Sequence, residues 1–271
     1  MGLTIETVRY GAGDVFSAYV AYPDRAALPL PAIVVIQEAW GVDPHIEDVT
    51  RRFAQAGYVA FAPDLFATSG VRPEPLSRER IANFLQFFNA LPPNVWMDQP
   101  KRDEALAALP EDKRAPLVET MTTIFSNTTN DAYLEPILAA TEFCRGSYAP
   151  SRGQRVGAIG FCMGGRLSAR TACADPKLAA AIVCYGMSPP EEMVEKIRCP
   201  VLGLYGKNDK RINDTVPAFQ EAAKKHDKRL EAFFFEGAGH AFFNDTRPSY
   251  NVAAARESFV EMLAFFETNL T

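Results

Sequence analysis

Long apolar runs and clusters of basic residues are both missing from this chain of 271 residues. No apolar stretch reaches the roughly 20 residues that a membrane-spanning helix needs, and residues 1–6 lack the charged-then-apolar pattern of a signal peptide. The net charge is only −5, and the chain lacks the cluster of basic residues that binding to the phosphate backbone of a nucleic acid requires. These absences predict a cytoplasmic protein with no membrane or nucleic-acid partner.

Cysteine and histidine are scarce, with five and three residues. An odd number of cysteines without metal-ligand spacing predicts reduced thiols, with neither a disulfide framework nor a metal site. The cysteines are Cys144, Cys162, Cys173, Cys184 and Cys199. Two of the histidines, His45 and His226, lie in polar stretches that are predicted to be helical or to precede a helix. The search for a catalytic base therefore narrows to the third histidine.

Apolar residues make up 48% of the chain, which is enough for one sizeable core. Their pattern predicts an antiparallel hairpin at a sheet edge, followed by buried strands that alternate with helices to the end of the chain. We therefore expect one α/β domain over residues 1–271, with a mostly parallel sheet covered by helices on both faces. The predicted elements near the start are a hairpin over 3–7 and 15–22, strands over 31–36 and 58–62, and a helix over 46–56. The last helix, over 250–269, carries a core stripe of Phe259, Met262, Leu263 and Phe266.

Residues 156–165 form an apolar, strand-like run that breaks into Gly-x-Cys-x-Gly and then starts a helix. A sharp strand-to-helix turn needs small residues two before and two after its apex, and Gly160 and Gly164 meet that need. The apex residue, Cys162, is then exposed at the positive end of a helix, where a thiolate is stabilised. The motif alone fits a nucleophile and a buried structural cysteine about equally well.

Two later strand ends carry the other residues of a possible triad. The predicted strand over 201–206 ends just before Asp209, and the strand over 230–236 ends before a glycine loop that contains His240. Nucleophile, acid and histidine in this chain order are typical of the α/β-hydrolase fold. An aspartate in this position is also an ordinary turn former. The order and the loop positions nevertheless favour a Cys162–His240–Asp209 triad.

Five short motifs together resemble the dienelactone hydrolases, also called carboxymethylenebutenolidases. They are Gln37-Glu38-Ala39-Trp40-Gly41, Pro63-Asp64-Leu65-Phe66, Gly160-Phe161-Cys162-Met163-Gly164-Gly165, Gly206-Lys207-Asn208-Asp209 and Gly239-His240-Ala241-Phe242. The resemblance covers most of the chain and implies an α/β-hydrolase fold with a Cys-His-Asp triad. It also implies hydrolysis of a small ester or lactone through an acyl-thiol intermediate, without a metal or an organic cofactor.

The loop after the first buried strand supplies part of an oxyanion hole in this fold. The backbone N–H groups of Ala39 and Met163 are therefore predicted to hold the developing oxyanion. The resemblance implies that Glu38 lies beside the thiol and accepts its proton. From the residues alone, Glu38 could equally be a surface residue or an N-cap partner.

A helix predicted from Ser77 onward places Arg80, Phe84 and Phe87 on one face. It is similar to the family helix whose arginine binds the substrate carboxylate, so these residues and Trp40 are predicted to bind substrate. A solvated arginine beside core aromatics fits the same pattern. Residues 89–130 are expected to form a helical insertion or lid, divided into short helices by prolines near their starts. These prolines are Pro92, Pro93, Pro100, Pro110 and Pro116.

Two positions depart from the family pattern. Ala241 stands where a serine follows the catalytic histidine, and Asn244 stands where a second carboxylate-binding arginine is expected. The preference for a carboxylate on the substrate should therefore be weakened, while ester or lactone hydrolysis is not affected. A general short-chain carboxylesterase, or a thiol protein with a redox or ligand-binding role, are the alternatives. The sequence predicts a small-molecule substrate and gives no oligomeric state.

Overall fold

The computed structural model describes residues 2–67, 69–92, 95 and 98–271, so Pro93 lies outside the described part. The chain divides into two compact units. Unit 1 contains residues 1–70 and 131–271, and unit 2 contains residues 71–130. Unit 2 therefore begins at Val71, well before the expected insertion at residue 89.

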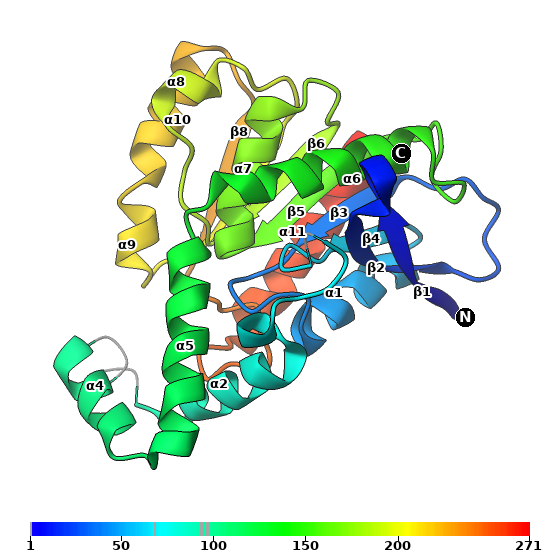
Figure 1. The fold of residues 1–271 in the computed structure, drawn as a ribbon. Helices are drawn as coiled ribbons and strands as arrows, with labels where there is room; N and C mark the ends of the chain where they lie inside the picture. Colours follow the sequence, from blue (N-terminus) through cyan, green and yellow to red (C-terminus); the bar gives the residue numbers. More distant parts are fainter. Residues whose placement is uncertain (1, 68, 93–94, 96–97) are drawn as a thin grey trace. The chain divides into compact units, whose positions relative to one another are not determined.

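Unit 1 is built on an eight-stranded sheet with the order β1-β2-β4-β3-β5-β6-β7-β8 (Figure 1). The β1–β2 and β2–β4 pairs are antiparallel and all the others are parallel. The predicted N-terminal hairpin at a sheet edge is confirmed, as is the mostly parallel sheet. The strands are β1 (Leu3–Tyr10), β2 (Phe16–Pro23), β3 (Ala32–Ile36), β4 (Val59–Pro63), β5 (Val156–Phe161), β6 (Ala180–Cys184), β7 (Val201–Gly206) and β8 (Leu230–Phe235).

Helices cover both faces of this sheet. In the view of Figure 1, α6 and α7 lie in front of it and α1 and α11 behind it. Helix α1 begins where the Asp43 side chain accepts a hydrogen bond from the Ile46 N–H, with Pro44 in its first turn. The helices of unit 1 are α1 (Pro44–Gln55), α6 (Leu134–Gly146), α7 (Met163–Ala174), α8 (Glu191–Val194), α9 (Lys210–Asn213), α10 (Val216–Lys225) and α11 (Val252–Leu270), with 3₁₀ turns η1 (Ala12–Asp14) and η3 (Asp131–Tyr133).

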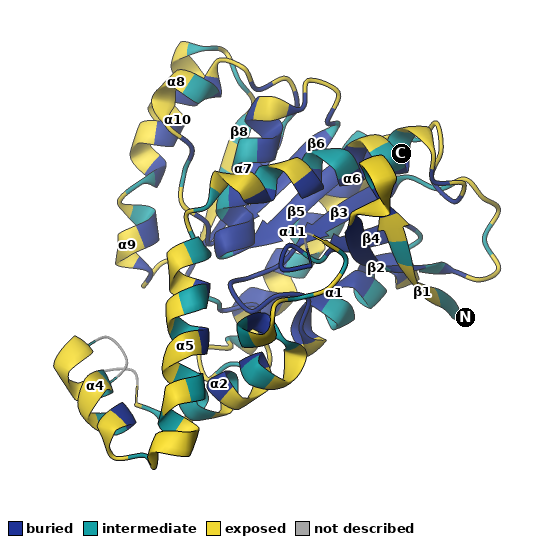
Figure 2. Ribbon diagram, in the orientation of Figure 1, coloured by how far each residue is buried: buried dark blue, intermediate teal, exposed yellow. Residues whose placement is uncertain are grey.

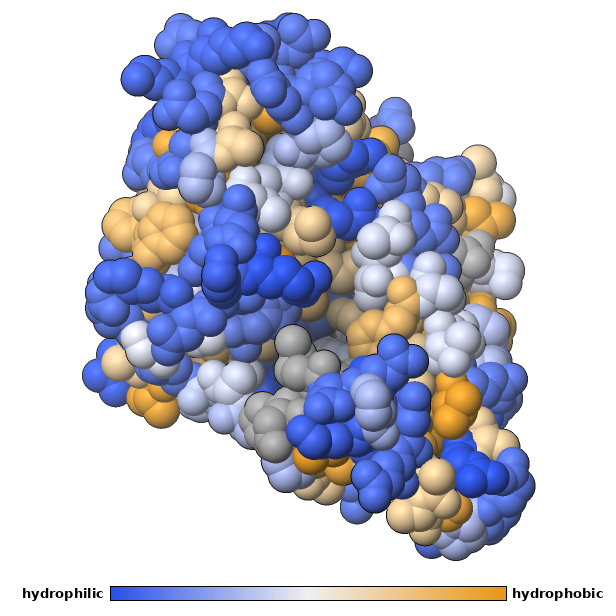
Figure 3. Space-filling model, turned by 90° about the vertical axis from the view of Figure 1, so that its left-hand side faces the viewer, coloured by the Kyte–Doolittle hydropathy of each residue, from blue (hydrophilic) through white to orange (hydrophobic). Residues whose placement is uncertain are grey.

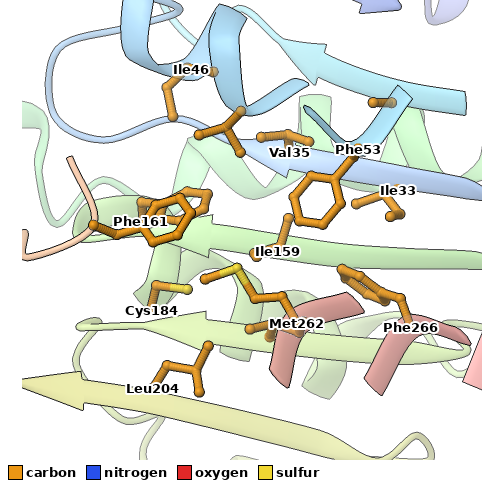
Figure 4. Close-up of a cluster of buried hydrophobic side chains, with 14 of the residues drawn as sticks. Ile33, Val35, Ile46, Phe53, Ile159, Phe161, Cys184, Leu204, Met262 and Phe266 are labelled. Carbon is orange, nitrogen blue, oxygen red and sulfur yellow. The ribbon is translucent and has the colours of Figure 1, made fainter. Parts of the chain in front are cut away.

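The core lies where the apolar strands meet the helices behind them, as Figure 4 shows. Every residue of β3, β5, β6 and β7 is buried, which explains why these strands read as continuous apolar runs (Figure 2). Met262 and Phe266 of α11 are buried, and Phe259 and Leu263 pack against the same cluster. The predicted core stripe of the last helix is therefore confirmed. His45 was expected in a polar stretch, but its ring is buried against Phe161 and Phe243.

Unit 2 is helical, with η2 (Glu74–Leu76), α2 (Arg78–Ala90), α4 (Gln99–Ala107) and α5 (Glu111–Asn127). Ser77 caps α2 by accepting a hydrogen bond from the Arg80 N–H. Pro100 lies in the first turn of α4 and Pro110 at the N-cap of α5, as predicted. Pro116 was expected near a helix start, but it lies inside α5. A proline here removes one intrahelical hydrogen bond without ending the helix.

The surface drawn in Figure 3 is mainly hydrophilic, with smaller hydrophobic areas scattered over it. Among the residues that the structure describes, no helix combines the length and the apolar character needed to cross a membrane.

Candidate active site

Cys162 sits at the sharp turn between β5 and α7, with backbone angles φ 54° and ψ −113°. A Cβ atom on Gly160 would collide with the backbone of Gly164, and one on Gly164 would collide with the carbonyl groups that end β3. The turn is therefore possible only because both positions are glycine. The same close contact brings the loop after β3 against the start of α7.

Three side chains from three different loops meet at this turn. His240, in the loop after β8, has Nε2 3.1 Å from Cys162 Sγ. Its Nδ1 lies 2.5 Å from Oδ2 of Asp209, which follows β7. The parallel order β5-β6-β7-β8 places the carboxyl ends of these strands at one edge of the sheet, so residues 78 and 31 positions apart come together.

The electrostatics of this group favour a protonated His240. Burial by itself lowers the pKa of His240, but the Cys162 thiolate and the Asp209 carboxylate outweigh it and raise that pKa well above its usual range. The imidazolium form of His240 is therefore favoured at neutral pH and is lost as pH rises through this raised pKa. A thiolate beside an imidazolium is in general a competent nucleophile.

Glu38 is buried, with an exposed fraction of 1%, in the loop after β3. Its Oε1 accepts a hydrogen bond from the Tyr185 hydroxyl at 3.1 Å, and its Oε2 accepts one from Asn244 Nδ2 at 2.7 Å. Among the described residues, these are the hydrogen bonds of its side chain, and Cys162 is not one of its partners. Ala39, the next residue, is buried, and Met163 is the first residue of α7.

Tyr185 was not singled out from the sequence. It follows the last residue of β6 with a positive φ of 39°, which is uncommon for a tyrosine. Its ring lies edge-on to His240 and to Phe242, with ring centres 5.4 Å apart in both pairs. A tyrosine directly after a buried strand and before Gly186 was the only sequence signal for this position.

Trp40 is buried, and the guanidinium carbon of Arg247 lies 5.1 Å from the centre of its ring. Burial lowers the pKa of Arg247, while the negative charges of Glu38, Cys162 and Asp43 act in the opposite direction. Arg247 therefore interacts electrostatically with Cys162. Arg247 was not predicted to be a site residue from the sequence.

Arg80 belongs to unit 2, where its guanidinium group is held by several oxygen atoms. It pairs with Glu74 and Glu119 at 2.7 Å, and donates to Thr120 Oγ1 at 3.1 Å and to the Pro116 carbonyl at 2.6 Å. On the same helix, Phe84 is buried and Phe87 is half-buried. These contacts give Arg80 a structural part in unit 2, and its predicted part in substrate binding stays a prediction.

Among the residues that the structure describes, no group of three or more His, Cys, Asp or Glu side chains is arranged to hold a metal ion.

The other cysteines differ sharply from Cys162 in their surroundings. Burial raises the pKa of Cys144 and Cys199 to about 12 and that of Cys173 to about 11, and it raises that of Cys184 well above the usual range. Cys199 lies in a bend before β7.

Iodoacetamide is therefore expected to alkylate Cys162 at least about tenfold faster than any other cysteine at neutral pH, because only the thiolate reacts. Timed alkylation followed by peptide mass spectrometry measures each rate. Equal labelling of Cys173 would contradict this expectation.

The mostly parallel sheet with helices on both faces, together with the sharp strand-to-helix turn at Cys162 and its neighbouring histidine and aspartate, defines an α/β-hydrolase fold. The family model for the dienelactone hydrolase family matches residues 16–270. The chain belongs to this family, whose members are carboxylic ester hydrolases acting broadly on esters and lactones.

Individual relatives agree with this assignment. Two proteins named "Putative carboxymethylenebutenolidase" are similar over most of the chain. The one from Saccharolobus solfataricus is 33% identical over 93% of this chain and 94% of its own. The one from Escherichia coli K12 is 30% identical over 94% of this chain and 83% of its own. A crystal structure described as a "Putative Dienelactone Hydrolase" from Klebsiella pneumoniae has a TM-score of 0.64 and 28% identity, covering 98% of this chain and 99% of that one.

Proposed function

We propose that the chain hydrolyses small esters or lactones through an acyl-thiol intermediate on Cys162. The observation that supports this most directly is the 3.1 Å contact between Cys162 Sγ and His240 Nε2, with Asp209 behind the imidazole at 2.5 Å. A nucleophile, a base and a group that orients the base are thereby aligned for acyl transfer.

In the first half-reaction, the thiolate attacks the substrate carbonyl carbon and forms the C–S bond. The N–H groups of Ala39 and Met163 hold the oxyanion, a task in which one donor is typically worth about 2.7–4 kcal/mol. His240 then gives its proton to the leaving oxygen as the C–O bond breaks. In the second half-reaction, His240 takes a proton from water, the hydroxide oxygen attacks the acyl carbon, and the C–S bond breaks to release the acid.

Single-turnover acylation with a chromogenic ester tests this proposal. We expect a burst that scales with enzyme concentration, and an acyl adduct on Cys162 in the intact mass spectrum. Cys162→Ala should show neither. A redox or ligand-binding protein would give no burst and no adduct with the wild-type chain, and that result would reject the proposal.

The substrate is proposed to carry an anionic group, because a cation interacts electrostatically with the nucleophile. Arg247 acts electrostatically on Cys162, whereas the guanidinium of Arg80 is already paired with two glutamates. A charge-assisted pair with a substrate carboxylate contributes about 1.5–3 kcal/mol, or about one to two decades in catalytic efficiency. Trp40, Phe84 and Phe87 remain predicted contacts of the same substrate.

We expect the preference in kcat/KM for a carboxylated lactone over its methyl ester to fall about tenfold or more in Arg247→Gln. Arg80→Gln, measured alongside, should reduce this preference by less. If Arg80→Gln reduced it by more than Arg247→Gln does, the prediction that Arg80 binds the substrate would be favoured instead. An equal rate for both substrates in the wild-type enzyme would favour a general short-chain carboxylesterase.

A further inference from the structure

Strand β8 is the last strand of the sheet, at the end opposite β1 (Figure 1). Its parallel pairing with β7 uses one edge of its backbone. Among the residues that the structure describes, no strand pairs with its other edge. An open edge of this kind presents a row of N–H and C=O groups to which another extended chain can hydrogen-bond. Strand β8 is therefore a candidate surface for protein association.

The backbone groups of β8 that face outward follow from its register with β7. The Val201 N–H donates to the Arg229 carbonyl, and the Lys207 N–H donates to the Phe235 carbonyl, both at 2.9 Å. Consecutive residues of a strand direct their backbone groups to opposite edges, so the odd-numbered residues of β8 face β7. The residues whose N–H and C=O groups consequently point away from the sheet are Leu230, Ala232 and Phe234.

Both faces of β8 expose an aromatic ring to solvent. Phe233 and Phe234 are neighbours in the strand, so their side chains lie on opposite faces of the sheet. They are 37% and 41% exposed, although the Phe234 ring also contacts Tyr205 of β7, with ring centres 5.5 Å apart. Apolar surface on both faces of an open edge strand is typical of an interface, and it is a liability for a chain that stays single.

The sequence of β8 is self-complementary in one antiparallel register. A two-fold axis between two copies of a strand places one residue opposite its own copy. With Ala232 at the axis, this small residue meets itself and Leu230 lies opposite Phe234 of the second copy. All the outward N–H and C=O groups of these residues then pair across the interface. An axis at Glu231 would instead place two carboxylates opposite each other, which is unfavourable.

Charges at the two ends of β8 fit the same register. Lys228 and Glu236 lie just outside the strand, and this register places each of them opposite the other residue of the second copy. Glu236 uses Oε1 for Lys207 of its own chain, so its Oε2 can accept a further donor. Glu231, in the middle of the edge, pairs with Arg229 of its own chain at 3.2 Å. Its carboxylate therefore brings a compensating cation to the interface.

We propose that two copies of this chain associate through their β8 edges, antiparallel and centred on Ala232, so that the two sheets continue into one. A second copy is favoured over an extended peptide of another protein, because the register that satisfies the backbone also matches apolar with apolar side chains and lysine with glutamate. The inference goes beyond the proposed function and does not rest on it, since the Cys162–His240–Asp209 group has no part in the pairing.

Sedimentation equilibrium of the full chain at several concentrations measures its mass and the dissociation constant. We expect twice the chain mass of 29.8 kDa at about 10 μM and above. Ala232→Pro removes the outward N–H at the axis, which the pairing with β7 does not use, and an edge strand tolerates such a proline. This variant should be monomeric at the same concentrations. Circular dichroism and thermal unfolding identify any variant that does not fold.

A charge exchange tests the register. Lys228→Glu and Glu236→Lys each place like charges opposite each other at both ends, and each should raise the dissociation constant about tenfold or more. The double variant restores opposite charges and should return to within about threefold of the wild-type constant. Lys177→Glu is the matched control, because it changes the net charge equally in the loop between α7 and β6. It should keep the wild-type constant.

A wild-type chain that stays monomeric up to about 100 μM overturns the proposal; this is also the result expected if the edge binds an extended peptide of another protein. A dimer that Ala232→Pro and both single charge variants leave unchanged overturns it too, because that dimer forms through another surface. A double variant that stays dissociated overturns the register centred on Ala232. If Ala232→Pro does not fold, the charge series decides alone. Acylation of Cys162 is measured separately, so either proposal can fail without the other.

Discussion

Replacing His240 with alanine is expected to lower kcat/KM for an ester substrate by at least about 10³-fold, because general acid–base catalysis is lost in both half-reactions. The variant also loses the imidazolium that stabilises the thiolate, so the alkylation of Cys162 should slow in parallel. Steady-state kinetics with a chromogenic ester and timed alkylation measure the two effects on the same preparation.

Asp209→Asn should lower kcat/KM less than His240→Ala does, and the two losses should differ by about tenfold or more. The aspartate orients the imidazole and stabilises its cation without transferring a proton. His226→Ala is the matched control, since His226 lies at the end of α10 and outside the site. It should keep wild-type kinetics. Wild-type turnover in folded His240→Ala would reject the triad.

Gly164→Ala is expected to have the largest effect on stability. The added methyl group would collide with the backbone carbonyl groups of Ile36 and Gln37 at the end of β3. Backbone in a buried parallel sheet cannot yield easily, so we expect the free energy of unfolding to fall by about 3 kcal/mol. Any displacement of the β3 loop would also move Ala39 away from Cys162, and kcat should fall with stability.

Denaturant unfolding monitored by circular dichroism measures this loss. Gly146→Ala is the control, because a Cβ atom at this position at the end of α6 meets no atom within 4 Å. Its free energy of unfolding should stay within about 0.5 kcal/mol of wild type. If both variants were equally stable, the close approach of α7 to β3 would not be what requires glycine at the nucleophile turn.

The cysteines differ in pKa and the arginines differ in their charged partners, and both differences have the same physical cause. That cause is how far the charged group is removed from water and which partner compensates for the loss. Burial raises the pKa of Cys144 more than Arg145 lowers it, and it raises the pKa of Cys184 as well, so both thiols stay neutral. Arg80 has two carboxylates, whereas Arg247 stacks on Trp40 and interacts electrostatically with Cys162. Among the described residues, Cys162 and Arg247 are therefore the thiol and the arginine to which the proposed chemistry on an anionic ester assigns a part.

The sequence by itself predicted the strand-turn-helix around Cys162, the strand ends before Asp209 and His240, and the fold that connects them. These features are local. A glycine pattern and an apolar run reflect interactions within a few residues, and the chain order is read directly from the sequence. All three can therefore be recognised without knowing the tertiary structure. The family motifs around Glu38 and Trp40 were readable for the same reason.

Only the tertiary structure decided what surrounds Glu38. Tyr185 lies 147 residues from Glu38 along the chain and Asn244 lies 206 residues from it, and both belong to loops whose own sequence shows no carboxylate partner. The same holds for His45, which was predicted only to lie in a polar, helical or pre-helical stretch, and whose ring two phenylalanines bury. Such contacts depend on how the strands are ordered in the sheet, and strand order is a long-range property that local propensity and periodicity do not contain.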